Sequence, residues 1–112
     1  MTRRSLEVLR NPSKGPYAAI AAAGTTQATA AAMTADVVMV TSGAEEAGVI
    51  LPAMNAREEC IVCNGLNVDI NVYPIVGGQL NNSTANLPLI LAPFTAARFR
   101  AINGAGSVMV FV

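Results

Sequence analysis

The sequence predicts an all-β fold: a small antiparallel β-sandwich or jelly roll of residues 17–112, preceded by an extended N-terminal arm of residues 1–16. Three observations support this fold class. Short runs rich in β-branched residues recur from residue 36 onward, as in Val37–Thr41. Turn residues, such as the pair Asn64-Gly65, separate these runs. The spacing gives about seven to nine short strands, which suits a sandwich or jelly roll.

The arm carries most of the positive charge of the chain. Four of the seven basic residues lie in it, and only Glu7 opposes them. Prolines at 12 and 16 prevent a long helix. Two interpretations stay open, a docking arm that binds a partner and a disordered terminus. The arm residues predicted to bind this partner are Arg3, Arg4, Leu6, Val8, Leu9, Arg10 and Lys14.

Residues 17–35 are ambiguous between strand and helix. Their many alanines have high helix propensity. Against a helix stand Gly24, four threonines and the absence of a leucine stripe at helical spacing. The alternation in Thr26–Ala30 is typical of a strand with a face of small residues. We therefore expect two short strands around Gly24, with a helix as the alternative.

Residue 36 onward has stronger strand patterns. Asn64-Gly65 predicts a hairpin into Leu66–Tyr73. In that run Leu66, Val68, Ile70 and Val72 are expected to face the core, and the face formed by Asn67, Asp69, Asn71 and Tyr73 is expected not to be core. In Arg98-Phe99-Arg100 the two arginines are expected on the face opposite the ring. The other predicted strands are Gly48–Leu51, Glu59–Cys63, Leu87–Leu91, Ala97–Ile102 and Ser107–Val112.

The residue types present give no indication of catalysis or of a cofactor. The chain has no histidine, the commonest general base and metal ligand. Cys60 and Cys63 are the only cysteines, too few for a structural zinc site, and on a strand they would point to opposite faces as reduced packing residues. With a net charge of zero, the chain is not expected to bind nucleic acid. No convincing membrane span is present.

The composition favours assembly with other proteins. Apolar residues make up 53% of the chain and charged residues only 12%, about half the usual charged share. Part of this apolar fraction is alanine, which adds little hydrophobicity. A surface with so few charges is still well suited to being covered by a partner, so we expect homodimers or homotrimers.

A set of short segments in order resembles a β-module of tailed-bacteriophage virion proteins, found in capsid decoration, cement and head-fibre proteins. The segments are Gly48–Pro52, Cys60–Asn64, Val72–Pro74, Gly77-Gly78 with Leu80-Asn81, Leu87–Pro93, Arg98-Phe99 and, before them, residues 23–30. Together they span roughly residues 20–112, nearly the whole chain. The basic arm departs from the module and looks like an addition for docking.

The resemblance implies a structural, non-enzymatic virion protein, made in the host cytoplasm, that binds the outer surface of a phage capsid and reinforces it. Its expected partners are the major capsid protein and itself. The alternative implied function is a head- or tail-fibre domain that presents a receptor-binding surface.

Overall fold

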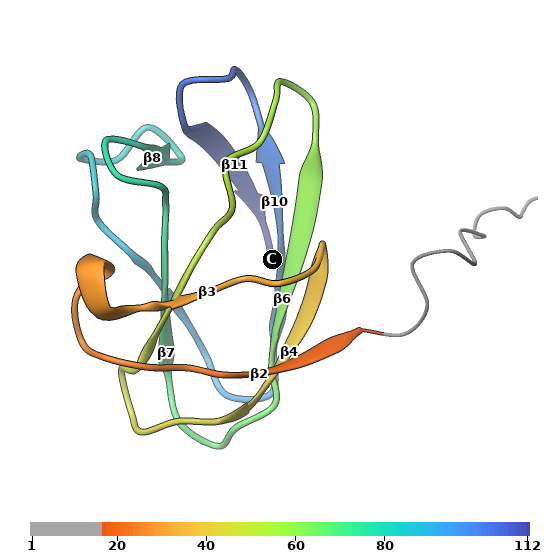
Figure 1. The fold of residues 1–112 in the computed structure, drawn as a ribbon, viewed down its shortest axis with the longest axis vertical. Helices are drawn as coiled ribbons and strands as arrows, with labels where there is room; N and C mark the ends of the chain where they lie inside the picture. The colour runs from red at the N-terminus through yellow and green to blue at the C-terminus, as the bar shows by residue number, and fades with distance from the viewer. Residues whose placement is uncertain (1–16) are drawn as a thin grey trace, which may run out of the picture.

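A computed structural model describes residues 17–112, which form ten strands and one short 3-10 helix (Figure 1). The strands make two sheets, and the prediction of an all-β fold is confirmed. In order across the six-stranded sheet lie β2 (Ala18–Ala21), β4 (Val37–Ser42), β6 (Glu59–Asn64), β10 (Ala96–Ala101), β11 (Ser107–Phe111) and β8 (Gln79–Leu80). The four-stranded sheet contains β3 (Ala31–Ala32), β5 (Gly48–Ile50), β7 (Ile70–Tyr73) and β9 (Leu89–Leu91).

From β2 to β10 each strand lies in the opposite sheet from the strand before it. Two crossings separate successive strands of one sheet. β2, β4 and β6 run parallel to one another, as do β3, β5 and β7, whereas β9 runs antiparallel to β7. β8 also pairs in parallel with β11. The predicted antiparallel arrangement is therefore wrong for five of the eight strand pairings. The segment at Asn64-Gly65 carries the chain from β6 across to β7 in the other sheet, so these two strands form no hairpin.

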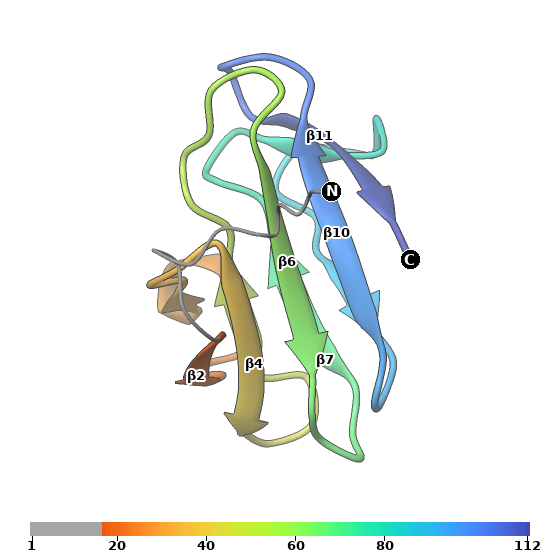
Figure 2. The same ribbon diagram turned by 90° about the vertical axis from the view of Figure 1, so that its right-hand side faces the viewer.

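The core lies between the two sheets (Figures 1 and 2). Alternate residues of each strand point inward, as period-two patterning requires. Phe99, between the two exposed arginines of β10, is fully buried, so the predicted orientation of this strand is confirmed. The largest other side chains that are completely buried are Val38, Val40, Val49, Val62, Ile70, Val72 and Leu91.

Asn64 ends β6 and takes the place of the predicted hairpin turn. Its side chain is 2% exposed, and its Nδ2 donates hydrogen bonds to the carbonyl oxygens of Val68 (2.8 Å), Leu91 (3.1 Å) and Ala92 (3.1 Å). Its Oδ1 accepts from the backbone N–H of Leu66 (3.0 Å). The hairpin prediction is wrong because this inward-facing amide joins two crossings between the sheets instead of sitting at a two-residue turn.

Residues 24–30 lie over the outer side of the four-stranded sheet and are called here the cover segment. The two expected strands around Gly24 are confirmed as β2 and β3, but Thr26–Ala30 is not a strand, because Gln27–Thr29 form the 3-10 helix η2. The Oγ1 atoms of Thr26 and Thr29 lie 2.8 Å apart and close this turn. The threonines therefore cap a turn locally, a use that competes with extended structure.

Tyr73 is buried beneath the cover segment, contrary to the expectation for its face of the strand. Only Ile70–Tyr73 of the predicted strand form β7, with Ile70 and Val72 in the core as expected. The Tyr73 hydroxyl donates to the carbonyl oxygen of Thr25 (3.1 Å), and the side chain is 5% exposed. A Cβ on Gly48 would lie 2.8 Å from the Tyr73 ring, so the glycine provides the space the ring occupies.

Candidate functional site

The outer face of the six-stranded sheet is turned toward the viewer in Figure 2, and no segment of residues 17–112 crosses it. This surface, called here the outer face, consists of the residues of β2, β4, β6, β10 and β11 that alternate with the buried ones. Three of its residues are charged and most of the others are apolar. Its principal members are Ala19, Val37, Met39, Glu59, Ile61, Cys63, Ala96, Arg98, Arg100, Met109 and Phe111.

Strand register places these side chains in continuous rows. Val37 pairs with Ile61, Ile61 with Arg98, and Arg98 with Phe111, which makes one row across four strands. A second row runs from Met39 through Cys63 to Ala96. Side chains paired across neighbouring strands lie about 5 Å apart and touch. The apolar residues of β4 and β6 therefore form one surface, and the two arginines of β10 separate it from Met109 and Phe111 on β11.

The three charged residues of the outer face form a single group. Arg100 Nη1 lies 2.6 Å from Glu59 Oε2, and Arg98 Nε lies 3.9 Å from the same oxygen. The Arg98 guanidinium also lies over the Phe111 ring, 4.9 Å from its centroid. Two arginines thus share one carboxylate, and the group has one positive charge in excess.

Phe94 stands beside the outer face with its ring 72% exposed. Its φ is 56°, in the left-handed region that a bulky residue rarely adopts. The turn is held by hydrogen bonds from Thr95 Oγ1 to the Ala92 carbonyl oxygen (2.7 Å) and from the Asn64 N–H to the Thr95 carbonyl oxygen (2.7 Å). Phe94, Met39, Cys63 and Ala96 help line an open hollow of about 350 Å³.

The role of Phe94 was missed by the sequence reasoning. No predicted strand or site includes Phe94, because the predicted strand ends at Leu91 and the segment that resembles the phage module ends at Pro93. The available signal was an aromatic residue within a turn, where burial of its ring is not required. An exposed ring on strained backbone is a feature typical of functional surfaces.

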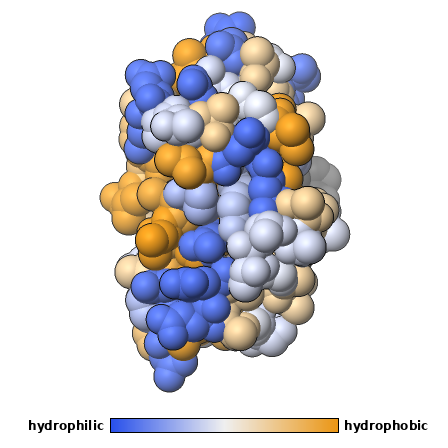
Figure 3. Space-filling view, turned by 90° about the vertical axis from the view of Figure 1, so that its left-hand side faces the viewer, coloured by the Kyte–Doolittle hydropathy of each residue, from blue (hydrophilic) through white to orange (hydrophobic). Residues whose placement is uncertain are grey.

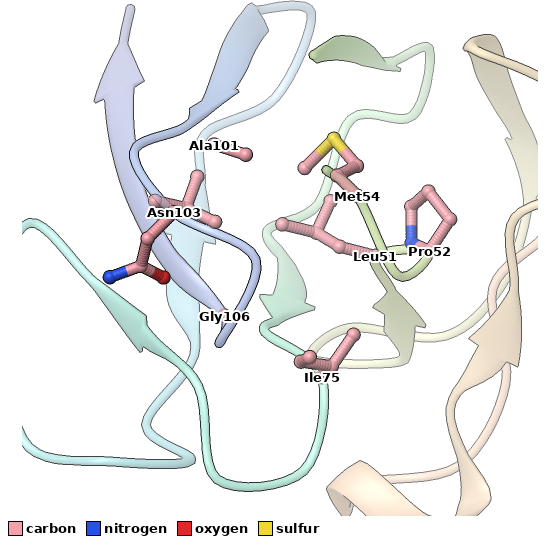
Figure 4. A pocket seen from close by; sticks show the side chains of 8 residues that line it. Leu51, Pro52, Met54, Ile75, Ala101, Asn103 and Gly106 are labelled. Carbon is pink, nitrogen blue, oxygen red and sulfur yellow. The ribbon is translucent and has the colours of Figure 1, made fainter. Parts of the chain in front are cut away.

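Two other hollows in residues 17–112 do not form a comparable site. The one in Figure 4 lies between the sheets beside Leu51, Met54 and Ile75, and its volume of 10 Å³ matches about one water molecule. The other is lined by Asp36, Glu58 and Glu59, and Glu58 Oε1 accepts a hydrogen bond from the Asn55 N–H (2.8 Å). No group of three or more His, Cys, Asp or Glu side chains in the described part of the chain is arranged to hold a metal ion.

The two cysteines lie on opposite faces of β6, as predicted, and both are free thiols. Cys60 points into the core, and burial, with smaller contributions from Asp36 and Glu59, raises its pKa to about 12. Its thiol is therefore protonated at neutral pH and is a poor nucleophile. Cys63 belongs to the outer face.

The seven arm residues predicted to bind a capsid (Arg3, Arg4, Leu6, Val8, Leu9, Arg10 and Lys14) lie outside the described residues. None of the helices in the described range has the length and apolar character needed to cross a bilayer. Comparisons of the chain with protein-family models, curated proteins and solved structures found no match.

Proposed function

We propose that this chain is a structural protein of a phage virion that binds the outer surface of the capsid and reinforces it, as a decoration or cement protein. The observation that carries the proposal is the outer face, a mostly apolar sheet surface that residues 17–112 leave uncovered. Exposed apolar patches of this kind mark surfaces that bind other proteins. The two-sheet fold is proposed to be the β-sandwich or jelly-roll module of such proteins.

By itself, the outer face adds little to the stability of a small domain, because its apolar side chains remain in contact with water. Val37, Met109 and Phe111 contribute large apolar side chains that remain exposed. Covering such a surface stabilises a complex by about 25 cal/mol for each Å² of apolar area removed from water. A chain of 112 residues has a small core, so docking on a large shell would add to its stability.

The arm provides a second contact in this proposal. Tyr17 precedes β2, which lies at one edge of the six-stranded sheet, so residues 1–16 join the molecule at that edge. The arm has four basic residues and one acidic residue, whereas residues 17–112 have three arginines and six carboxylates. Basic side chains of the arm would pair with carboxylates of the shell. Self-association into a dimer or trimer remains part of the proposal.

The alternative function is a domain of a head or tail fibre. Phe94 favours it, because exposed aromatic rings bind sugars and proteins at receptor-binding surfaces. A fibre domain would bind its receptor at the cell surface and would not bind along the faces of the shell.

Empty shells of the major capsid protein encoded by the same phage test the proposal. After incubation with purified protein, the shells are sedimented and imaged by cryo-electron microscopy. We expect the protein to pellet with the shells and to add density at regular positions on their outer surface. Binding to host cells without binding to shells would favour the fibre alternative and contradict the decoration role.

A further inference from the structure

We infer that the outer face is the surface that docks on the capsid protein, and that the docked surface is apolar and carries a carboxylate opposite Arg98. This inference rests on the proposed function and extends it by naming the surface and the chemistry of its partner. It comes from the charge of the outer face, from the position of Phe94 and from the difference between the two sheets.

The excess positive charge requires a partner when the outer face is covered. Glu59 accepts a short contact from Arg100 at 2.6 Å, while Arg98 is 3.9 Å away. Removing an unpaired charge from water is costly unless a charge of opposite sign replaces the water. Arg98 is therefore the residue whose guanidinium needs a carboxylate from the other protein.

The same charge count argues against a second copy of this chain as the occupant. Two outer faces pressed together would bring four arginines against two glutamates, and two positive charges would remain without a partner. Pairing of two outer faces therefore leaves arginines without carboxylates, whereas a capsid protein with a carboxylate opposite Arg98 would pair with it.

Phe94 is the residue best placed to anchor the contact. Its exposed ring rises beside the hollow that Met39, Cys63 and Ala96 help line, so a side chain of the partner can pack against both. Aromatic and arginine residues dominate binding energy in protein interfaces. The outer face offers Arg98 and Arg100 on β10 and Phe111 on β11, and Phe94 lies beside it.

The opposite side of the molecule provides a matched control. Figure 3 shows that side, where hydrophilic residues separate the hydrophobic ones into groups. Ile90 on β9 is 65% exposed there and lies on the outer side of the four-stranded sheet. It resembles the residues of the outer face in exposure and hydrophobicity but lies on the other sheet.

Three variants of the full-length chain test the inference by cosedimentation with shells of the major capsid protein. Phe94→Asn removes the ring with a residue that tolerates a positive φ. Arg98→Glu places a carboxylate against the proposed carboxylate of the shell. Ile90→Thr is the control variant, and it keeps a β-branched side chain at this exposed position on the other sheet. We expect the first two to weaken binding by at least about tenfold and Ile90→Thr to change it by less than about twofold.

Each result bears on the inference. If the wild-type chain does not bind shells, the proposed function fails and the inference fails with it. If wild type binds and Phe94→Asn and Arg98→Glu bind equally well, the inference is overturned while the decoration role stands. Tighter binding by Arg98→Glu would exclude a carboxylate on the partner. Light scattering that gives a wild-type dimer and a Phe94→Asn monomer would identify a second copy as the occupant.

Discussion

The two sheets of this molecule differ in what covers their outer sides. The four-stranded sheet is covered in part by the cover segment of the same chain, beneath which Tyr73 is 5% exposed. On the six-stranded sheet no described segment plays this role, and Phe111 is 46% exposed. Strand alternation gives both sheets an outer side, so the alternation pattern alone does not determine burial. The position of the cover segment determines which outer side is buried.

The difference has a local structural cause. Gly24 has a φ of 69°, which turns the chain into the cover segment, and Gln27 Nε2 donates a hydrogen bond to the Pro74 carbonyl oxygen (2.8 Å). Gly48 leaves room for the Tyr73 ring below. Residues of the same chain therefore hold the cover segment against the four-stranded sheet.

The largest effect on stability is expected for Tyr73→Ala. Removing a buried aromatic side chain loses apolar contacts, leaves a cavity and removes the hydroxyl that binds Thr25. We expect the free energy of unfolding to fall by about 3 kcal/mol, measured by urea denaturation.

The matched variant on the other sheet is Phe111→Ala, which removes a half-exposed ring. We expect it to cost less than about 1 kcal/mol, because most of that ring is already in water. Equal losses of unfolding free energy for Tyr73→Ala and Phe111→Ala would mean that the outer face is covered in the isolated protein. That result would contradict the difference between the two sheets.

The sequence was sufficient to predict most of the strands, although not β8 (Gln79–Leu80), and it did not predict their connections. Val37–Ser42 and Glu59–Asn64 lie where the β-branched runs indicated, because local propensity and alternation act within a few residues. The Asn64 amide instead bonds to carbonyl groups 27 and 28 residues away, which no local pattern reveals. The site was predictable in one part only: Arg98 and Arg100 share a face because strand period is two, whereas Phe94 depends on a turn formed by distant contacts.

Gly24→Ala should have the next largest effect, about 2 kcal/mol. A Cβ there would lie 2.0 Å from Thr29 Oγ1, and the left-handed backbone is itself unfavourable for alanine. The cover segment must then shift, so hydrogen exchange should accelerate at the Thr29 amide. Gly77→Ala is the control, since Gly77 has a φ of 83° but open space around it, and it should cost about 1 kcal/mol. If Gly24→Ala and Gly77→Ala lower the free energy of unfolding equally, the close approach of Thr29 to residue 24 contributes nothing to stability.

The free energy of unfolding is expected to depend on pH through Cys60 at high pH, with a slope on the order of 1 kcal/mol per pH unit. Burial raises the pKa of the Cys60 thiol from 9.0 to about 12 in the folded chain. Its contribution is fully present below pH 9 and is lost as pH rises from 9 to 12, because only the unfolded state releases the proton there. Cys60→Ala should be less stable but should lose less stability over this range. A wild-type chain and a Cys60→Ala variant with parallel stability curves would contradict the burial of this thiol.

The smallest effect is expected for the charges of the outer face in the isolated protein. Glu59 and Arg100 are both about one-third or more exposed, and exposed ion pairs contribute at most about 1 kcal/mol. Arg100→Ala should therefore lower the free energy of unfolding by less than about 0.5 kcal/mol, with the difference shrinking in high salt. A loss above about 2 kcal/mol would mean that the charge group holds the sheet together. A small loss would mean that these charges contribute little to folding, which agrees with the proposal that they bind a charged partner.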